Sequence, residues 1–458
     1  MEPDPDNAGG GIYKCEKEKI LSDAENSVFL NVKRCTVELS PKLPPEWGIE
    51  PVPRDKRILG AIDYFVLWSS LAVGLLVLQA GGLLIPGLSA LEAMIIALAG
   101  SIIGSVMLAL AGGLGSKYGI PTMVSLRAVL GLRGSFVPTT LNVVQLVGWA
   151  SFEILIMANS ALLIGGQFLG PYTLYFWILA FAVWCMILSI GGPLVVIRHW
   201  LEKFAIWFTY GTAIFITYVV LSNFSQILSS SGDGSLPLAL ALDIVIAMPI
   251  SWWPLISDYN RFSKSEKGAI LGTLTGYTFA NSWFYALGAL LVLAYPGKDI
   301  MSSIVSITFG GLALAILLVD ETDNGFADIY SSAVSIQNMS PKSRQWKLIV
   351  GITAISVFLA ALIPGTWQSA YESFLLYIGA FFVPLLGVVA VDFYIIRKKQ
   401  YNLEEFYSTT RSLKIKPIVS WVVGIALYYV LYNYTAWGSS IPSFIGSAIT
   451  LYLLEKAT

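Results

Sequence analysis

Long apolar stretches separated by short polar breaks run along the chain from about residue 60 to its end. Between Asp63 and Lys117 the only charged residue is Glu92, and between Glu153 and Arg198 there is none. Such gaps are long enough for membrane-spanning helices, which need about 20 apolar residues each. The pattern therefore predicts an all-α polytopic membrane protein.

Twelve stretches are predicted to form transmembrane helices. The first five cover Gly60–Ile85, Leu91–Leu114, Phe136–Ile164, Tyr172–Ile190 and His199–Ser222. The next five cover Leu238–Phe262, Gly268–Tyr295, Met301–Met339, Trp346–Ile363 and Ser369–Ile396. The last two cover Ile415–Tyr434 and Gly438–Leu454.

The first and second groups of five helices have similar lengths. An odd number of helices per group gives the two groups opposite orientations, and inverted repeats of this kind are typical of secondary transporters. Coincidence is the alternative explanation of the equal lengths. The predicted parts are a cytosolic tail at 1–57, the first repeat at 58–222, the second at 238–396, and two C-terminal helices with a short cytosolic end at 397–458.

The placement of basic residues tests this topology. With the N-terminus inside, every Lys and Arg except Lys298 lies in the tail or in a cytoplasmic loop or end, as expected for a membrane protein. Both termini are therefore expected in the cytoplasm, with the protein in the plasma membrane. The single histidine, His199, borders a span and is expected at headgroup level rather than as a ligand.

Composition narrows the class. The chain has 56% hydrophobic and 12% charged residues, which rules out a soluble protein, and its net charge of −1 gives no reason to expect a nucleic-acid partner. The three cysteines, Cys15, Cys35 and Cys185, form no disulfide or metal pattern. The polar tail is expected to contain no cleaved signal peptide and to be loosely ordered.

The first and sixth predicted helices carry signals of a break. The first has Ser69, Ser70 and Gly74 before a glycine pair, and the sixth has prolines at 249 and 254 around Ser-Trp-Trp. Each proline removes a backbone donor and disturbs the preceding turn. An unwound backbone at membrane depth is tolerated where it lines a cavity, although a simple proline kink is the alternative.

Acidic residues inside the spans mark a candidate site, because buried charges in a membrane are costly. In the third predicted helix Gln145, Trp149 and Glu153 are spaced by four and share one face. A structural role for Glu153, bonded to a neighbouring helix, is the alternative.

The eighth predicted helix reads DETDNGFAD over residues 320–328, and we expect Asp320, Asn324 and Asp328 to form one stripe. Four carboxylates without a basic partner require protons, a cation, a positively polarised substrate or water to balance them. This favours coupling to Na⁺ or H⁺, although part of the cluster facing an aqueous vestibule is the alternative. A planar ring is expected to stack between Trp149 and Trp252 or Trp253.

Four stretches carry a family resemblance. They read Gly115-x-Lys117-x-Gly119-x-x-Thr122 followed by Arg127, Gly131 and Gly134-Ser135-Phe136-x-Pro138; Gln145-x-x-Gly148-Trp149; Ser257-Asp258-Tyr259-Asn260-Arg261-Phe262; and Phe326-x-Asp328-x-Tyr330-Ser331-x-x-x-Ser335. In these stretches the chain resembles the nucleobase:cation symporters, which are the cytosine/purine, uracil, thiamine and allantoin permeases. It looks nearest to the hydroxymethylpyrimidine transporter branch.

The resemblance implies a fold of five-plus-five inverted repeats, with discontinuous helices 1 and 6 and two further C-terminal helices, and transport by alternating access. It implies that Trp149 stacks on the substrate and that Glu153 and Asp328 bond to it. The predicted substrate site also includes Gln145, Asn324, Ser251 and Trp252, and the breaks, expected near Gly74 and Met248, should supply backbone contacts. Asp258 and Arg261 are expected to cap and anchor a helix instead.

The family's sodium site implies a role for Thr322 and Asp323, with helix-one carbonyls near Ser69 and Ala72. Only Thr322 keeps the hydroxyl of the family pattern, so Na⁺ and H⁺ both remain open. Carboxylates at 153 and 328 suit an aminopyrimidine, cytosine or adenine better than uracil, because they accept bonds from amino groups.

The function expected is therefore import of a planar nucleobase-like heterocycle by Na⁺ or H⁺ symport. An allantoin or hydantoin-type permease, or a substrate-sensing receptor on the same fold, is the alternative. His199 lies only at the border of a span, no HExxH motif occurs inside the spans, and Cys185 has no basic neighbour, so an enzyme is not expected. No cofactor is predicted beyond the coupling ion, and we expect the bilayer and the small molecule as partners of a functional monomer.

Overall fold

The structure, a computed structural model, describes residues 12–21, 29–38, 47–197, 206–222, 224–365, 367–408 and 412–457. It divides into two units, Met1–Pro45 and Glu46–Thr458. In the first unit, strands β1 (Ile12–Leu21) and β2 (Phe29–Glu38) pair antiparallel, with Glu16 opposite Arg34. The tail was expected to be loosely ordered, and the structure describes two paired strands within it.

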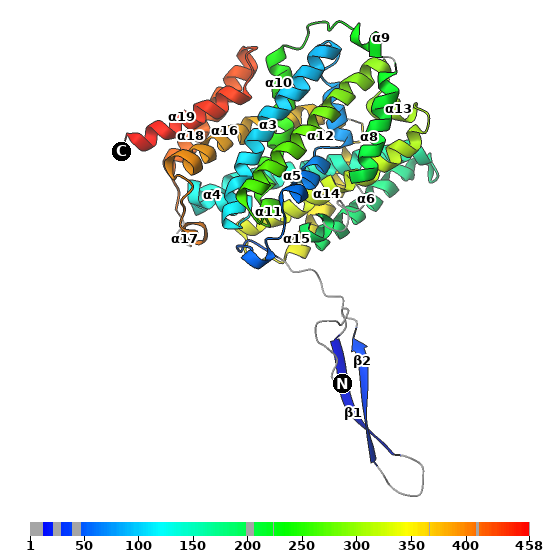
Figure 1. Ribbon diagram of the computed structural model, residues 1–458, viewed down its shortest axis with the longest axis vertical. Coiled ribbons are helices and arrows are strands. Elements are labelled where there is room, and N and C mark those ends of the chain that lie inside the picture. The colour runs from blue at the N-terminus through cyan, green and yellow to red at the C-terminus, as the bar shows by residue number, and fades with distance from the viewer. Residues whose placement is uncertain are drawn as a thin grey trace. The chain divides into compact units, whose positions relative to one another are not determined.

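The second unit is helical (Figure 1). Its first half contains η1 (Arg54–Lys56), α1 (Ala61–Ser70), α2 (Leu75–Gly82), α3 (Ala90–Tyr118), α4 (Thr122–Leu130), α5 (Leu132–Gly165), η2 (Gly170–Tyr172), α6 (Thr173–Gly191), α7 (Pro193–Val195), α8 (Ile206–Leu221) and α9 (Phe224–Leu228). The rest contains α10 (Leu238–Ser251), η4 (Trp253–Leu255), α11 (Ile256–Asn260), α12 (Glu266–Ala294), α13 (Ile300–Val305), α14 (Gly310–Met339), α15 (Gln345–Leu362), α16 (Trp367–Ala390), η5 (Val391–Ile396), α17 (Leu403–Tyr407), α18 (Ile415–Tyr434) and α19 (Ser440–Lys456).

Helices occupy every predicted span, although His199 and the start of the fifth span lie outside the described residues. Within the described part, eight helices are long and apolar enough to cross a membrane, or nine if α1 and α2 form one bent span. The helices α8 and α19 are shorter, and α14 carries the acidic cluster. The all-helical membrane fold is confirmed, while twelve spans in two inverted repeats remain a prediction.

The first predicted break is confirmed, since α1 and α2 meet at an angle of 61°. The second lies later than expected, because Met248 and Pro249 are still within α10 and the helix changes to the 3₁₀ form at Trp253–Leu255. Pro254 explains this position, because the first turn of a helix makes no use of the N–H that proline lacks.

The eighth predicted span, Met301–Met339, is two helices, and treating it as one was wrong. Phe309 takes a left-handed conformation (φ 63°) between α13 and α14. A Cβ on Gly310 would lie 1.9 Å from the carbonyl oxygen of Ile304, so only glycine permits this turn.

The broken helix packs on α12 through glycines. A Cβ on Gly276 would lie 2.5 Å from the carbonyl oxygen of Phe65 in α1, and one on Gly288 would lie 2.1 Å from that of Leu78 in α2. Main chains therefore touch directly, as small residues allow in membrane helix pairs. Two further pairs, α3 on α12 and α5 on α14, join helices in equivalent positions of the two predicted repeats.

Residues 47–57 form a strap that precedes α1. The Arg261 guanidinium donates to the carbonyl of Gly48 (2.7 Å), and the Tyr407 hydroxyl donates to that of Ile49 (2.7 Å). The backbone N–H of Val52 donates to the carbonyl of Gly119 (2.8 Å). The strap thus joins α11, α17 and the end of α3.

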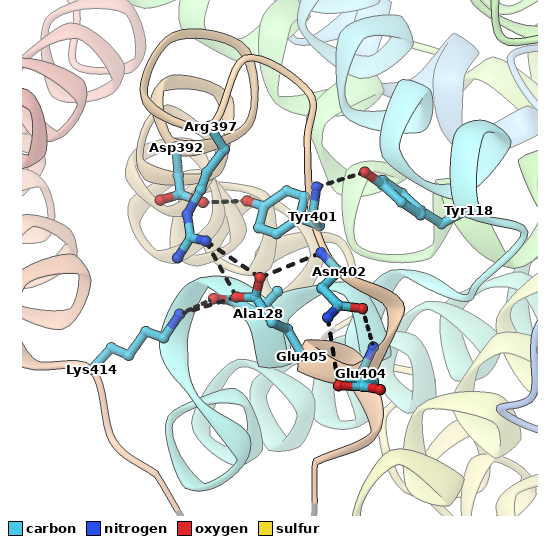
Figure 2. A network of polar contacts seen from close by, with 9 residues as sticks. All are labelled: Tyr118, Ala128, Asp392, Arg397, Tyr401, Asn402, Glu404, Glu405 and Lys414. Atoms are coloured by element: carbon cyan, nitrogen blue, oxygen red, sulfur yellow. Dashed lines mark hydrogen bonds and ion pairs between the residues drawn. The ribbon is translucent and has the colours of Figure 1, made fainter.

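The linker between η5 and α18 is held by a polar network (Figure 2). The Tyr401 hydroxyl donates to Asp392, and the Tyr401 backbone N–H donates to the hydroxyl of Tyr118 (2.7 Å). Arg397 pairs with Glu405 at 3.3 Å. Burial, and then the charge of Asp392, raise the pKa of Tyr401. This network fixes α17 against α3.

Buried Arg127 in α4 adds a second connection. Its guanidinium donates to the side-chain and backbone oxygens of Asn338 (both 2.7 Å) and to the carbonyl of Phe406 (3.1 Å). One side chain therefore joins α4, the end of α14 and α17.

Candidate functional site

A small cavity lies where the two interrupted helices meet α5 and α14. Its lining residues come from the α1–α2 break, α2, α5, the α10–η4 segment and α14: Leu71, Leu76, Val77, Trp149, Glu153, Met248, Ser251, Trp252, Leu255, Glu321, Asn324 and Asp328. Apolar and aromatic walls with a few convergent polar groups are typical of small-molecule sites.

Aromatic residues position the flat wall of the cavity. Trp149 is packed edge to face by Tyr371 (ring centroids 5.8 Å apart) and Phe374 (5.4 Å) of α16. Of the two candidate tryptophans at the second break, Trp252 lines the cavity, whereas Trp253 is buried against Phe382. Tyr371 and Phe374 were missed in the sequence, because nothing there shows that α16 packs on α5.

Three carboxyl groups line the cavity: those of Glu153, Glu321 and Asp328, each at most 4% exposed. Among the described atoms, Oε2 of Glu153 and Oε1 of Glu321 have no hydrogen-bond partner. No Lys, Arg or His occurs among the lining residues found in the described part of the chain. The cavity therefore offers hydrogen-bond acceptors to a ligand that carries N–H donors.

Glu321 was not assigned to the site from the sequence. Of the predicted stripe of Asp320, Asn324 and Asp328, the last two line the cavity, while Asp320 lies outside its lining and is approached at 3.4 Å by the Ser70 hydroxyl. Positions i, i+3 and i+7 share a helix face, so the stripe begins at Glu321. This spacing was available in the sequence as a signal.

Two predicted site residues lie just behind the lining. Gln145 donates to the backbone carbonyl of Ser251 at 3.1 Å. Gly74 is the residue before α2, and a Cβ there would lie 3.1 Å from both carboxyl oxygens of Glu321 and from Nδ2 of Asn324. Gly74 therefore lets the start of α2 approach α14 closely.

The four cation candidates lie away from the cavity lining. Asp323 accepts a hydrogen bond from the Ser70 hydroxyl at 2.6 Å, while its Oδ1 is buried without a partner in the described structure. The Thr322 hydroxyl donates to Val319 (2.7 Å), and the Ser69 hydroxyl accepts from Tyr210 (2.6 Å).

The last candidate, Ala72, is buried in the α1–α2 break. Within the described ranges, no three His, Cys, Asp or Glu side chains are placed to hold a metal ion. Any cation there would depend on backbone and hydroxyl oxygens together with Asp323.

The Ser257–Phe262 motif at the end of the sixth predicted span holds neighbouring helices together. Oδ1 of Asp258 accepts from the backbone N–H of Thr122 at 3.0 Å, and Arg261 donates to the hydroxyl of Tyr330 at 2.8 Å. These contacts hold α11 against α4 and α14. Neither side chain lines the cavity.

These features define a helical membrane transporter in which interrupted helices enclose a small-molecule cavity. Residues 51–453 match the family described as permeases for cytosine/purines, uracil, thiamine and allantoin. The chain belongs to this family, whose members are transporters and not enzymes.

Relatives with curated names agree with this assignment. The chain is 24% identical over 401 residues to a putative purine-cytosine permease, YxlA, of Bacillus subtilis, covering 82% of this chain and 84% of that protein. It is 25% identical over 457 residues to the allantoin permease of the same organism, covering 88% and 86%. The cytosine permease of Escherichia coli K12 is 25% identical over 420 residues, covering 88% and 93%.

Among solved structures, the nucleobase-cation-symport-1 family transporter Mhp1, in a closed conformation with bromovinylhydantoin bound, has a TM-score of 0.78 at 18% identity, covering 90% of this chain and 94% of that one. Its inward-facing conformation has a TM-score of 0.75 at 19% identity, covering 91% and 93%. These similarities show that the fold is that of this transporter.

Proposed function

We propose that the protein imports a planar nucleobase-like heterocycle by symport with Na⁺ or H⁺ through alternating access. One observation carries the proposal: an aromatic wall and buried acceptors meet in a single cavity at both helix interruptions. Relatives whose names include cytosine, purine-cytosine and allantoin support this substrate class.

Within the cavity, Trp149 stacks on the ring while Glu153 and Asp328 accept hydrogen bonds from it. The candidate substrates are hydroxymethylpyrimidine, cytosine and a purine. An allantoin or hydantoin-type substrate is the second candidate, favoured by the similarity to the allantoin permease.

The coupling ion is Na⁺ or H⁺. The buried, unpartnered Oδ1 of Asp323 supports either one, as a ligand for a hard cation or as a proton carrier. Thr322, Ser69 and the Ala72 carbonyl complete the proposed ion site. The protein acts as a monomer in the plasma membrane with both termini in the cytoplasm, in keeping with the distribution of basic residues.

Uptake into proteoliposomes tests the proposal. Labelled aminohydroxymethylpyrimidine, cytosine, adenine and allantoin are supplied with Na⁺ and H⁺ gradients imposed separately. We expect gradient-driven uptake of at least one of them, and counterflow of label without a gradient. No uptake and no counterflow for all four would refute the proposal, and binding without counterflow would identify a receptor.

A further inference from the structure

The two carboxyl oxygens of Glu321 have different surroundings. Oε2 accepts the backbone N–H of Leu75, the first residue of α2, at 2.7 Å. Oε1 has no partner among the described residues, although the side chain is 0% exposed and lines the cavity. A buried carboxylate oxygen without a donor is costly, so its position at the cavity indicates a donor on the ligand.

A purely structural role explains only half of this geometry. Capping the start of α2 requires one acceptor oxygen, which an amide side chain of the same length also supplies, although the carboxylate charge adds stability at a helix N-terminus. Oε1 of Glu321 takes no part in the cap. Glu321 lines the cavity beside Asn324, whose own Oδ1 also has no partner in the described structure.

Glu153 brings a second carboxyl group to the same place from α5. Its carboxyl lies beside that of Glu321, close enough for a hydrogen bond when one of the two is protonated, and its Oε2 has no partner in the described part of the chain. Two carboxylates in contact repel each other unless a positive or hydrogen-bond-donating group lies between them. No basic side chain occurs among the described lining residues, so either a proton shared by the pair or a donor on the ligand supplies that group.

We propose that Glu321 and Glu153 together bind a donor-rich edge of the substrate: an amino group beside a protonated ring nitrogen, as in an aminopyrimidinium ring. Each carboxylate accepts one N–H, and the positive charge of the ligand neutralises one of the two negative charges. A dioxo ring such as uracil presents carbonyl oxygens on both sides of its N3–H, and the carboxylates repel these oxygens. This selectivity rests on the proposed function and names its substrate class.

The test compares matched ligands by equilibrium binding to the purified full-length protein. Cytosine against uracil, and aminohydroxymethylpyrimidine against its 4-oxo analogue, differ mainly in the amino group. We expect the native protein to prefer the amino ligand. Glu321→Gln, which keeps the cap on Leu75, should reduce that preference about 10- to 100-fold, as should Glu153→Gln.

Asp320→Asn is the matched control, because it removes a buried carboxylate one residue away that does not line the cavity. It should leave the preference unchanged, and thermal melting of each variant reports whether it is folded. A folded Glu321→Gln protein with the native preference would overturn the proposal, as would a native protein that binds these rings without preferring the amino form. If the native protein binds none of the rings, the proposed function itself fails.

Discussion

Replacing Gly288 by alanine tests the direct contact between α12 and the broken helix. The new Cβ would lie 2.1 Å from the backbone carbonyl oxygen of Leu78, more than 1 Å short of the 3.4 Å at which ordinary contact begins. Neither atom belongs to a side chain that can rotate away, so the helices must separate. Overpacking of this kind costs about 3 kcal/mol, of which the better helix propensity of alanine returns about 1 kcal/mol.

The expected loss is therefore about 2 kcal/mol in the free energy of unfolding, or roughly a 30-fold change in the unfolding equilibrium. Reversible unfolding in mixed micelles with increasing denaturing detergent measures it. Gly351→Ala in α15 is the control, because a Cβ at Gly351 meets nothing within 4 Å. If Gly288→Ala is as stable as Gly351→Ala, the close packing of α12 on α2 is wrong.

Three further predictions concern binding, packing and pH. Trp149→Ala should weaken substrate binding at least 10-fold and Trp149→Phe less, because stacking needs a ring at this position; equal affinities would refute the stacking role. Arg127→Gln should lower the free energy of unfolding by about 3 kcal/mol, because it leaves the oxygens of Asn338 without their charged donor; an unchanged unfolding midpoint would contradict this. The pKa of Tyr401 is raised in the folded protein. Above about pH 10 Tyr401 therefore ionises in the unfolded chain but not in the folded one, so the free energy of unfolding should fall as pH rises. Unfolding midpoints of the native protein and Tyr401→Phe measured across that pH range should converge, and parallel curves would refute the assignment.

Hydrophobic patterning predicted the positions of the helices because membrane burial is recorded residue by residue along the sequence. It did not predict the end of α13, which depends on the approach of Gly310 to the carbonyl of Ile304. It placed the second interruption near Met248, which is too early. Pro249 lies inside α10, whereas Pro254 lies in the first turn of the next helix, and the sequence does not show which of the two ends the helix. These features depend on three-dimensional contacts that periodicity does not contain.

The site was predictable in part for the same reason. The spacing of Trp149 and Glu153 put both on one face of α5, and both line the cavity. Glu321 was missed because the rotation of α14 about its axis is set by packing, and because the donor that it caps, Leu75, is 246 residues away in sequence. The placement of charge revealed that α14 matters, but not which carboxylates face the ligand.

The strap at residues 47–57 has a consequence for the order of assembly during synthesis. Its carbonyls at Gly48 and Ile49 bond to Arg261 and Tyr407, which follow them by 213 and 358 residues. At about 5–20 residues per second, the ribosome reaches Tyr407 roughly 20–70 s after it has made the strap. Most of the helical bundle is therefore made before both bonds can form. A nascent chain that stops before α17 lacks the bond to Ile49, while Gly48 and Val52 can already bond to Arg261 and Gly119.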